Sequence, residues 1–140
     1  MSAIFDRVSV RKFLSTSVEE EKVEQLLRAG MAAPSAGNQQ PWQFVVVTDK
    51  ALNEQLGEAS KFSKPAANAP LNIVPVIDSE GGRFPELAPL DLSACVENIL
   101  LEAVELGLGG VWLCAYPEQD RMQRVREALG IPEDLEPFAI

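Results

Sequence analysis

Apolar residues between positions 17 and 33 recur at the spacing of one helix face. They fall at i, i+3, i+4 and i+8: Val23, Leu26, Leu27 and Met31. Ser17 and Glu20 match a capping box, in which each side chain bonds a free backbone N–H of the first turn. The pattern therefore predicts a helix that begins near Ser17 and ends near Ala33, where Pro34 stops it.

Runs rich in β-branched residues predict strands. Residues 44–48 are apolar on both faces, which favours a central strand covered on both sides. Residues 71–77 continue the pattern, although Pro75 has no backbone N–H and therefore indicates a sheet edge or a bulge. Two shorter runs, 111–115 and 136–140, are also typical of strands.

The longest predicted helix covers residues 91–108. Its polar residues gather on one side: Glu97, Asn98, Glu102 and Glu105. The remaining apolar face is so wide that the helix must contact more than one neighbour, so we place it at the centre of the core, with part of it against a second subunit. Shorter helices are predicted after Asp49, which caps the first, and before Gly130, which ends the second.

Two segments lack any periodic pattern. Residues 61–70 are rich in Lys, Ser, Pro, Ala and Asn, and we interpret them as a mobile loop. Residues 79–89 contain glycines, prolines and Phe84, and they are the best candidate for a lid.

Composition narrows the possible partners. The 140 residues fit one domain, and 46% of them are hydrophobic against 24% charged, so a packed core can form. A net charge of −9 argues against nucleic-acid binding, which needs a basic face. The first residues do not form a secretory signal and no run has membrane-spanning length, so we expect a cytoplasmic protein without membrane contact.

Histidine is absent, and the two cysteines, Cys95 and Cys114, both lie in apolar surroundings. We interpret both as buried small hydrophobes. Without histidine the usual general base and most zinc sites are excluded, so no metal site is expected. If the protein is an enzyme, a cofactor supplies the chemistry.

The loop from Ala33 to Trp42 carries the first candidate chemistry. Four neutral hydrogen-bonding side chains lie in it: Ser35, Asn38, Gln39 and Gln40. Amide and backbone groups of this kind can line a site for an uncharged planar molecule with polar edges. The alternative is an ordinary surface turn.

A basic cluster near the N-terminus is the second candidate. In an extended segment Arg7, Ser9 and Arg11 share a face, and two guanidinium groups with a hydroxyl can bind a phosphate. The alternative is a solvated basic edge. The glycine-rich turn at 107–110 is by itself a weak signal for phosphate or flavin contact.

Three motifs, in this order, resemble the FMN-dependent nitroreductase family. They are Arg-Val-Ser-Val-Arg-Lys-Phe at 7–13, Ala-Pro-Ser-Ala-Gly-Asn-Gln-Gln-Pro-Trp at 33–42, and Glu-Asn at 97–98 followed by Gly-Leu-Gly-Gly-Val-Trp at 107–112. The resemblance implies an α+β fold with a mixed central sheet flanked by helices, and a homodimer that holds two FMN molecules at its interface. The long helix would build much of that interface.

The resemblance also assigns cofactor contacts by position. The first motif would hold the FMN phosphate and the polar edge of its ring, the second would approach the flavin bound chiefly by the second subunit, and the third would lie against the flavin. The residues are Arg7, Val8, Ser9 and Arg11 from the first motif, Pro34, Ser35, Ala36, Asn38 and Gln40 from the second, and Gly110 and Val111 from the third.

The activity that the resemblance implies is an NAD(P)H oxidoreductase with two half-reactions at one site. NADH or NADPH gives a hydride to flavin N5, and a nitroaromatic, a quinone or a similar small acceptor then takes the electrons. No catalytic side chain is assigned, and Phe84 either stacks on the acceptor or fills the core. The alternatives are a flavin-binding module without turnover and a same-fold enzyme that acts as a dehalogenase or a dehydrogenase.

The sequence departs from the family pattern at its C-terminal end. Family members continue past residues 138–140 through a further strand, a Gly-Tyr-Pro-like turn and a tail with a basic residue that contacts the phosphate. Either this chain is a shortened form or its C-terminus lies outside the sequence. A single domain over residues 1–140 that lacked these parts would miss one strand and one phosphate ligand, so weaker FMN binding is expected.

Overall fold

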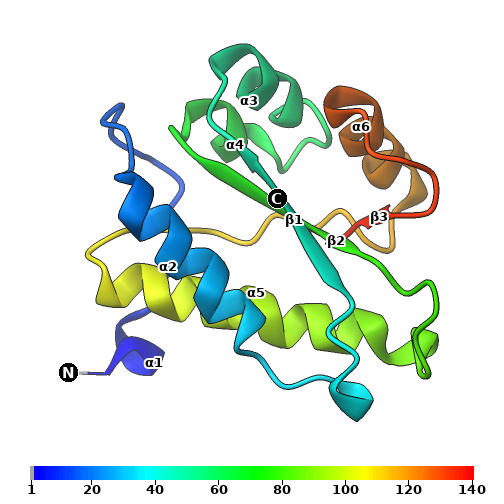
Figure 1. Cartoon of the computed structure of the whole chain (residues 1–140). Coiled ribbons are helices and arrows are strands. Elements are labelled where there is room, and N and C mark those ends of the chain that lie inside the picture. The colour runs from blue at the N-terminus through cyan, green and yellow to red at the C-terminus, as the bar shows by residue number, and fades with distance from the viewer. Residues whose placement is uncertain (1) are drawn as a thin grey trace.

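The computed structural model describes residues 2–140 (Figure 1). Its elements are α1 (Ala3–Asp6), α2 (Glu20–Met31), the 3-10 turn η1 (Ala36–Asn38), β1 (Trp42–Val47), α3 (Lys50–Leu56), α4 (Lys64–Asn68), β2 (Asn72–Ile77), the 3-10 turn η2 (Pro85–Leu87), α5 (Ala88–Glu105), α6 (Gln119–Leu129) and β3 (Glu136–Pro137).

The three strands form one antiparallel sheet in the order β1-β2-β3. Val45 of β1 pairs with Val74 of β2, and Ile77 of β2 pairs with Glu136 of β3. The prediction that the strand at 44–48 is central was therefore wrong, because β1 lies at the sheet edge and β2 lies in the middle. The position of β1 leaves Val46 41% exposed.

Pro75 lies in the central strand, against the prediction of an edge or a bulge. Its carbonyl accepts a hydrogen bond from Phe138 N at 2.9 Å. In an antiparallel strand the N and the carbonyl of one residue point to the same side, so the position without an N–H in Pro75 lies on the side of Phe138. No hydrogen bond between β2 and β1 is lost. The Phe138 carbonyl accepts instead from the backbone N–H groups of Ala115 and Tyr116, at 3.2 and 3.0 Å.

The parallel part of the predicted mixed sheet is limited to one isolated bridge in residues 2–140, between Ser9 and Gly110. The run at 111–115 pairs antiparallel with the end of the chain, where Leu113 and Ile140 exchange both backbone bonds at 3.0 and 2.9 Å. Both predicted runs are therefore extended, although only Glu136–Pro137 forms a regular strand.

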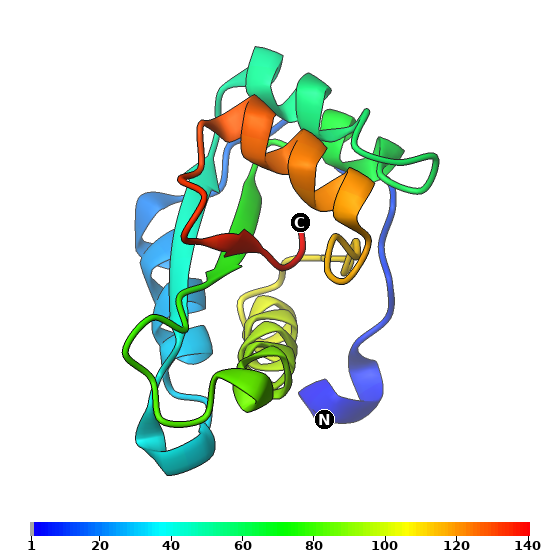
Figure 2. The same cartoon turned by 90° about the vertical axis from the view of Figure 1, so that its right-hand side faces the viewer.

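Helices cover both faces of the sheet, as Figures 1 and 2 show. One core cluster lies between the sheet and the helices α3, α4 and α6, with Leu56, Val74 and Val125 fully buried. The other lies between the sheet and α5, with Leu92 and Cys95 fully buried. Side chains alternate along β2 between the two clusters, which is how a strand with two apolar faces is buried.

Helix α2 begins later than predicted. Its N-cap is Glu19, which makes no side-chain cap bond, so the capping box of Ser17 and Glu20 is wrong. Its end at Met31 agrees with the stop expected before Pro34. The Asp49 cap of α3 is confirmed, because its carboxylate accepts from Leu52 N at 3.0 Å.

The two predicted loops are more ordered than expected. Residues 61–70 contain α4, in which Ala66 is fully buried, so the interpretation as a mobile loop was wrong. Residues 79–89 contain η2 and the start of α5. The predictions of a long helix, here 18 residues, and of a last helix ending at Gly130 are confirmed.

No helix within residues 2–140 is both long enough and apolar enough to cross a membrane.

The two cysteines differ in burial. Cys95 on α5 has no exposed surface, as predicted, and burial raises the pKa of its thiol to about 12. Cys114 is exposed, against the prediction. Its neighbours Leu113 and Ala115 are buried, and side chains of an extended segment alternate, so Cys114 points to the opposite side.

We expect a thiol reagent at pH 8 to label the native protein at Cys114 only, and to label Cys95 only after unfolding in urea. In the unfolded chain the Cys95 thiol has its ordinary pKa of 9.0 and loses its proton above that pH, whereas in the folded protein it stays protonated. The free energy of unfolding therefore falls as the pH rises above 9.0. Mass spectrometry of labelled peptides checks the labelling. Cys114→Ser is the control and should leave the native protein unlabelled.

Candidate functional site

The N-terminal segment docks on the turn that follows α5. Ser9 forms the parallel bridge with Gly110, and Val10 N donates to the Gly110 carbonyl at 2.9 Å. Gly109 allows this approach, because a Cβ there would lie 2.9 Å from Val10 Cγ2. The first and third motifs are thus brought together. Arg7, Val8 and Gly110 line a small cavity of about 130 Å³ beside this bridge.

The two arginines of the first motif differ in their surroundings. Arg7 contacts Glu97 of α5, with 3.6 Å between Nε and Oε1, and both side chains are partly exposed. This contact fixes Arg7 next to α5 but stabilises the fold little, since exposed ion pairs are weak. Ser9 and Arg11 are exposed, and Arg11 lines neither this cavity nor the larger one described below.

The loop of the second motif has an unusual backbone. Gly37, Asn38 and Gln40 have positive φ angles of 57°, 52° and 49°, a region that non-glycine residues rarely adopt. The Ser35 hydroxyl accepts from Gln40 N at 3.0 Å and so closes the turn. The Pro34, Asn38 and Gln40 side chains are exposed and available for a ligand.

Asp91 holds this loop, and sequence reasoning missed it. The side chain is buried, with 6% exposed, and Oδ1 accepts from Ala36 N at 2.9 Å while Oδ2 accepts from Gln39 Nε2 at 2.8 Å. Gln39 also bonds the backbone of Phe84 in both directions, at 3.0 Å to the carbonyl and 3.1 Å from the N–H. The one sequence signal was a carboxylate between apolar neighbours in the first turn of the long helix.

Phe84 packs against the same loop. Its ring lies over Gly37, where a Cβ would be 2.9 Å from Cε2, and Arg83 stacks on the ring with 5.4 Å between Cζ and the ring centroid. Phe84 is half-buried and belongs to neither core cluster, so this packing does not decide between the two interpretations of Phe84. A contact with an acceptor stays a prediction.

The second and third motifs lie at opposite ends of α5. The loop at 34–40 is tied to Asp91 near its start, whereas Gly110 follows its end and Arg7 contacts Glu97 at its middle. From Asp91 to its last residue, Glu105, the helix is roughly 21 Å long. One chain therefore does not bring the three motifs into a single site.

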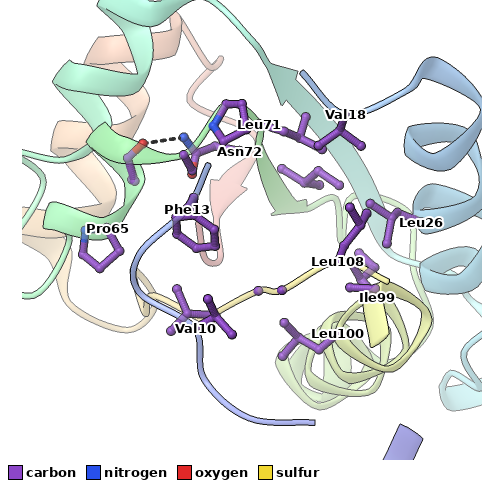
Figure 3. A pocket seen from close by; sticks show the side chains of 18 of the residues that line it. Val10, Phe13, Val18, Leu26, Pro65, Leu71, Asn72, Ile99, Leu100 and Leu108 are labelled. Atoms are coloured by element: carbon purple, nitrogen blue, oxygen red, sulfur yellow. Dashed lines mark hydrogen bonds between the residues drawn. The ribbon is translucent and has the colours of Figure 1, made fainter. Parts of the chain in front are cut away.

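The larger cavity, about 430 Å³, is lined mainly by apolar residues of the N-terminal segment, α5 and β2 (Figure 3). Of the predicted cofactor residues only Gly110 and Val111 line it, and its charged lining residues are Lys12 and Glu19. Trp112 also lines it, and its buried Nε1 has no hydrogen-bond partner among the described residues. This chemistry does not suit a phosphate.

Metal-ligating side chains do not gather anywhere in residues 2–140: no group of three or more Cys, Asp or Glu could hold an ion there.

Comparison with known proteins decides the family. The sequence model of the Nitroreductase family matches residues 4–80 and 61–140, which is nearly the whole chain. The chain belongs to the nitroreductase family. The resemblance seen in its three motifs is therefore confirmed, and so is the expected α+β nitroreductase-like fold, with its sheet antiparallel as described above.

Similar proteins extend over most of this nitroreductase-family chain. A protein of Archaeoglobus fulgidus, provisionally named NADH dehydrogenase/NAD(P)H nitroreductase, is 41% identical over all of this chain and 81% of its own length. A crystal structure from Clostridium acetobutylicum, provisionally named NADH oxidase, has a TM-score of 0.96 at 43% identity, covering 99% of this chain and 83% of that one. An FMN-dependent nitroreductase from Clostridium difficile has a TM-score of 0.91 at 30% identity, covering 99% and 82%.

Gly109→Ala should loosen the docking of the N-terminal segment. The added methyl group would overlap Val10, and such overpacking costs about 1–3 kcal/mol of unfolding free energy. Urea unfolding measures this loss, and hydrogen exchange of the Val10 amide reports the docking directly. Adding Val10→Ala should recover part of the stability. A Gly109→Ala protein as stable as the wild type would contradict the close approach.

Proposed function

We propose that this nitroreductase-family chain is an FMN-dependent NAD(P)H oxidoreductase that acts on a small oxidised acceptor such as a nitroaromatic or a quinone. The observation that carries the proposal is the docking of the Arg-x-Ser-x-Arg segment on the Gly110 turn, through the Ser9 bridge and the Val10 bond. An FMN-dependent nitroreductase of the same fold supports the cofactor.

The residues present fit FMN. Arg7, Ser9 and Arg11 offer guanidinium and hydroxyl donors for a phosphate at an otherwise acidic surface. The turn at Gly110 and Val111 offers backbone close to those donors. The second loop offers neutral donors for a ring edge, from the Ser35 hydroxyl and the Asn38 and Gln40 side-chain amides, on an exposed turn with a left-handed backbone. Pro34 offers only apolar contact, and the Ala36 N–H is already bonded to Asp91.

A homodimer completes this arrangement. Since the loop at 34–40 lies at the start of α5 and Gly110 follows its end, antiparallel pairing of two α5 helices about a two-fold axis would place the start of each beside the end of the other. The loop at 34–40 of one subunit would then face the Gly110 turn of the second, on which the segment with Ser9 docks. One cofactor site would form at each end of the interface.

Apolar residues outside the core support such an interface. Leu90, Leu101 and Val104 lie along one side of α5, at i, i+11 and i+14, and Leu90 is 67% exposed. Glu97 lies on the same side at i+7, where it contacts Arg7. Beside the end of α5 the segment 2–8 exposes Ile4 and Phe5, at 68% and 87%. Burying these side chains against a second copy would remove apolar surface from water.

Bound FMN would supply the redox chemistry, which is hydride uptake at N5 from NADH or NADPH and electron transfer to the acceptor. The task of the chain is then to bind and orient the ring and to exclude water. Neutral amide and backbone donors near the ring would stabilise negative charge on it without a side-chain acid. We keep the cytoplasm as the expected location.

Arg11→Ala should weaken FMN binding at least about tenfold, because it removes a charge-assisted hydrogen bond to the phosphate. Fluorescence quenching of added FMN measures the dissociation constant. Arg124→Ala is the matched control, since it removes the same charge from α6, where Arg124 pairs with Asp120. Retention of full FMN affinity by Arg11→Ala would remove this residue from the phosphate site.

Anaerobic addition of NADH or NADPH to the FMN complex separates the proposal from its alternatives. Loss of the visible absorbance of the oxidised flavin is expected for an oxidoreductase that uses a nicotinamide donor. A complex that stays oxidised with both donors would favour a flavin-binding module without turnover.

A further inference from the structure

We propose that Gln39 and Asp91 are positioning residues, which lock the loop at 34–40 in the conformation that contacts the flavin. The inference rests on the proposed function and adds two residues to it. Gln39 occupies a variable position of the Ala-Pro-Ser-x-x-Asn-x-Gln-Pro-Trp motif, and Asp91 lies outside all three motifs.

The carboxylate of Asp91 binds the loop at 34–40 to α5. It is buried and lies in the first turn of α5, where the positive end of the helix favours it. A buried charge needs hydrogen-bond partners, and the two known ones, Ala36 N and Gln39 Nε2, both come from the loop. Movement of the loop away from α5 would leave this charge unpaired, so the carboxylate holds the loop down.

Gln39 also hydrogen-bonds a second loop, residues 79–89. Its amide oxygen accepts from Phe84 N and its amide nitrogen donates to the Phe84 carbonyl, so the segment 79–89 is tied to the loop at 34–40. The two loops also pack together at two glycines. Gly37 lies against the Phe84 ring, and a Cβ added at Gly82 would be only 3.0 Å from Gln39 Oε1. The segment predicted to be a lid is therefore anchored at Phe84.

The lock acts on the flavin contacts through the backbone. Ala36 and Gln39 enclose Asn38, and Gln40 N is bonded to Ser35. Asn38 and Gln40 have left-handed backbones that are costly unless the surroundings impose them. Without the bonds to Asp91 the turn is free to relax, and the donors offered to the flavin lose their positions.

The proposal is tested with the reversed pair, the double variant Gln39→Glu/Asp91→Asn, in which the amide and the carboxylate exchange positions. Gln39→Glu places a second carboxylate beside that of Asp91, so the two repel each other. Asp91→Asn replaces the carboxylate by an amide, whose oxygen can accept from only one side while its nitrogen meets the other donor, Ala36 N or Gln39 Nε2. In the double variant the introduced amide can donate to the introduced carboxylate and accept from Ala36 N, which restores all bonds except that to the Phe84 carbonyl. Gln43→Glu is the matched control, because Gln43 donates to Asp78 in the same way, at 2.7 Å, on an exposed surface outside the loop.

We expect each single variant to bind FMN at least about tenfold more weakly than the wild type and to exchange the Ala36 and Phe84 amides faster. The double variant should recover part of both properties, because the carboxylate introduced at position 39 still faces the Phe84 carbonyl, and Gln43→Glu should change neither. Thermal unfolding shows whether each variant is still folded at the temperature of the binding and exchange measurements. The single variants should melt below the wild type, because the buried Asp91 side chain loses a partner, and the double variant should recover part of that loss.

Single variants that bind FMN as the wild type does, or a reversed pair no better than the single variants, would overturn the inference. If the wild type itself takes up no FMN, the proposed function fails instead. The exchange of the Ala36 and Phe84 amides would then still decide whether Gln39 and Asp91 hold the two loops together.

Discussion

The double burial of α5 is the constraint on which the rest of the structure depends. One side of the helix fills the core below the sheet through Leu92 and Cys95, while α2 packs along another. An 18-residue helix held in this way is rigid, so everything attached to its two ends stays far apart. The division of the candidate site into two halves follows directly from the length of this helix.

Each half is attached to α5 by a different kind of contact. Past the end of the helix the first motif pairs its backbone with Gly110, while Arg7 contacts Glu97 at the middle of the helix. At its start a buried carboxylate holds a strained turn through charge-assisted bonds. Breaking the second attachment would destabilise the fold more than breaking the first, because the buried charge of Asp91 would be left without hydrogen-bond partners.

Several parts of the fold were predictable because local chemistry decides them. The Asp49 cap, the Gly130 stop and the apolar periodicity of α2 and α5 all act within one helix, and the structure contains them. Three of the errors share one origin. Pro75, Cys114 and residues 61–70 were judged by their sequence neighbours, whereas their environments depend on segments that are distant in the chain.

The sequence by itself determined the family motifs, the α+β class and most helices, because these depend on residue spacing and on short-range hydrogen bonds. Only the tertiary structure decided that β2 is the central strand, that the motifs are separated by α5 and that Gln39 meets Asp91. Those two residues lie 52 positions apart, and neither carries a local signal of the other. Their contact exists because the packing of α5 under the sheet brings the loop to the start of that helix.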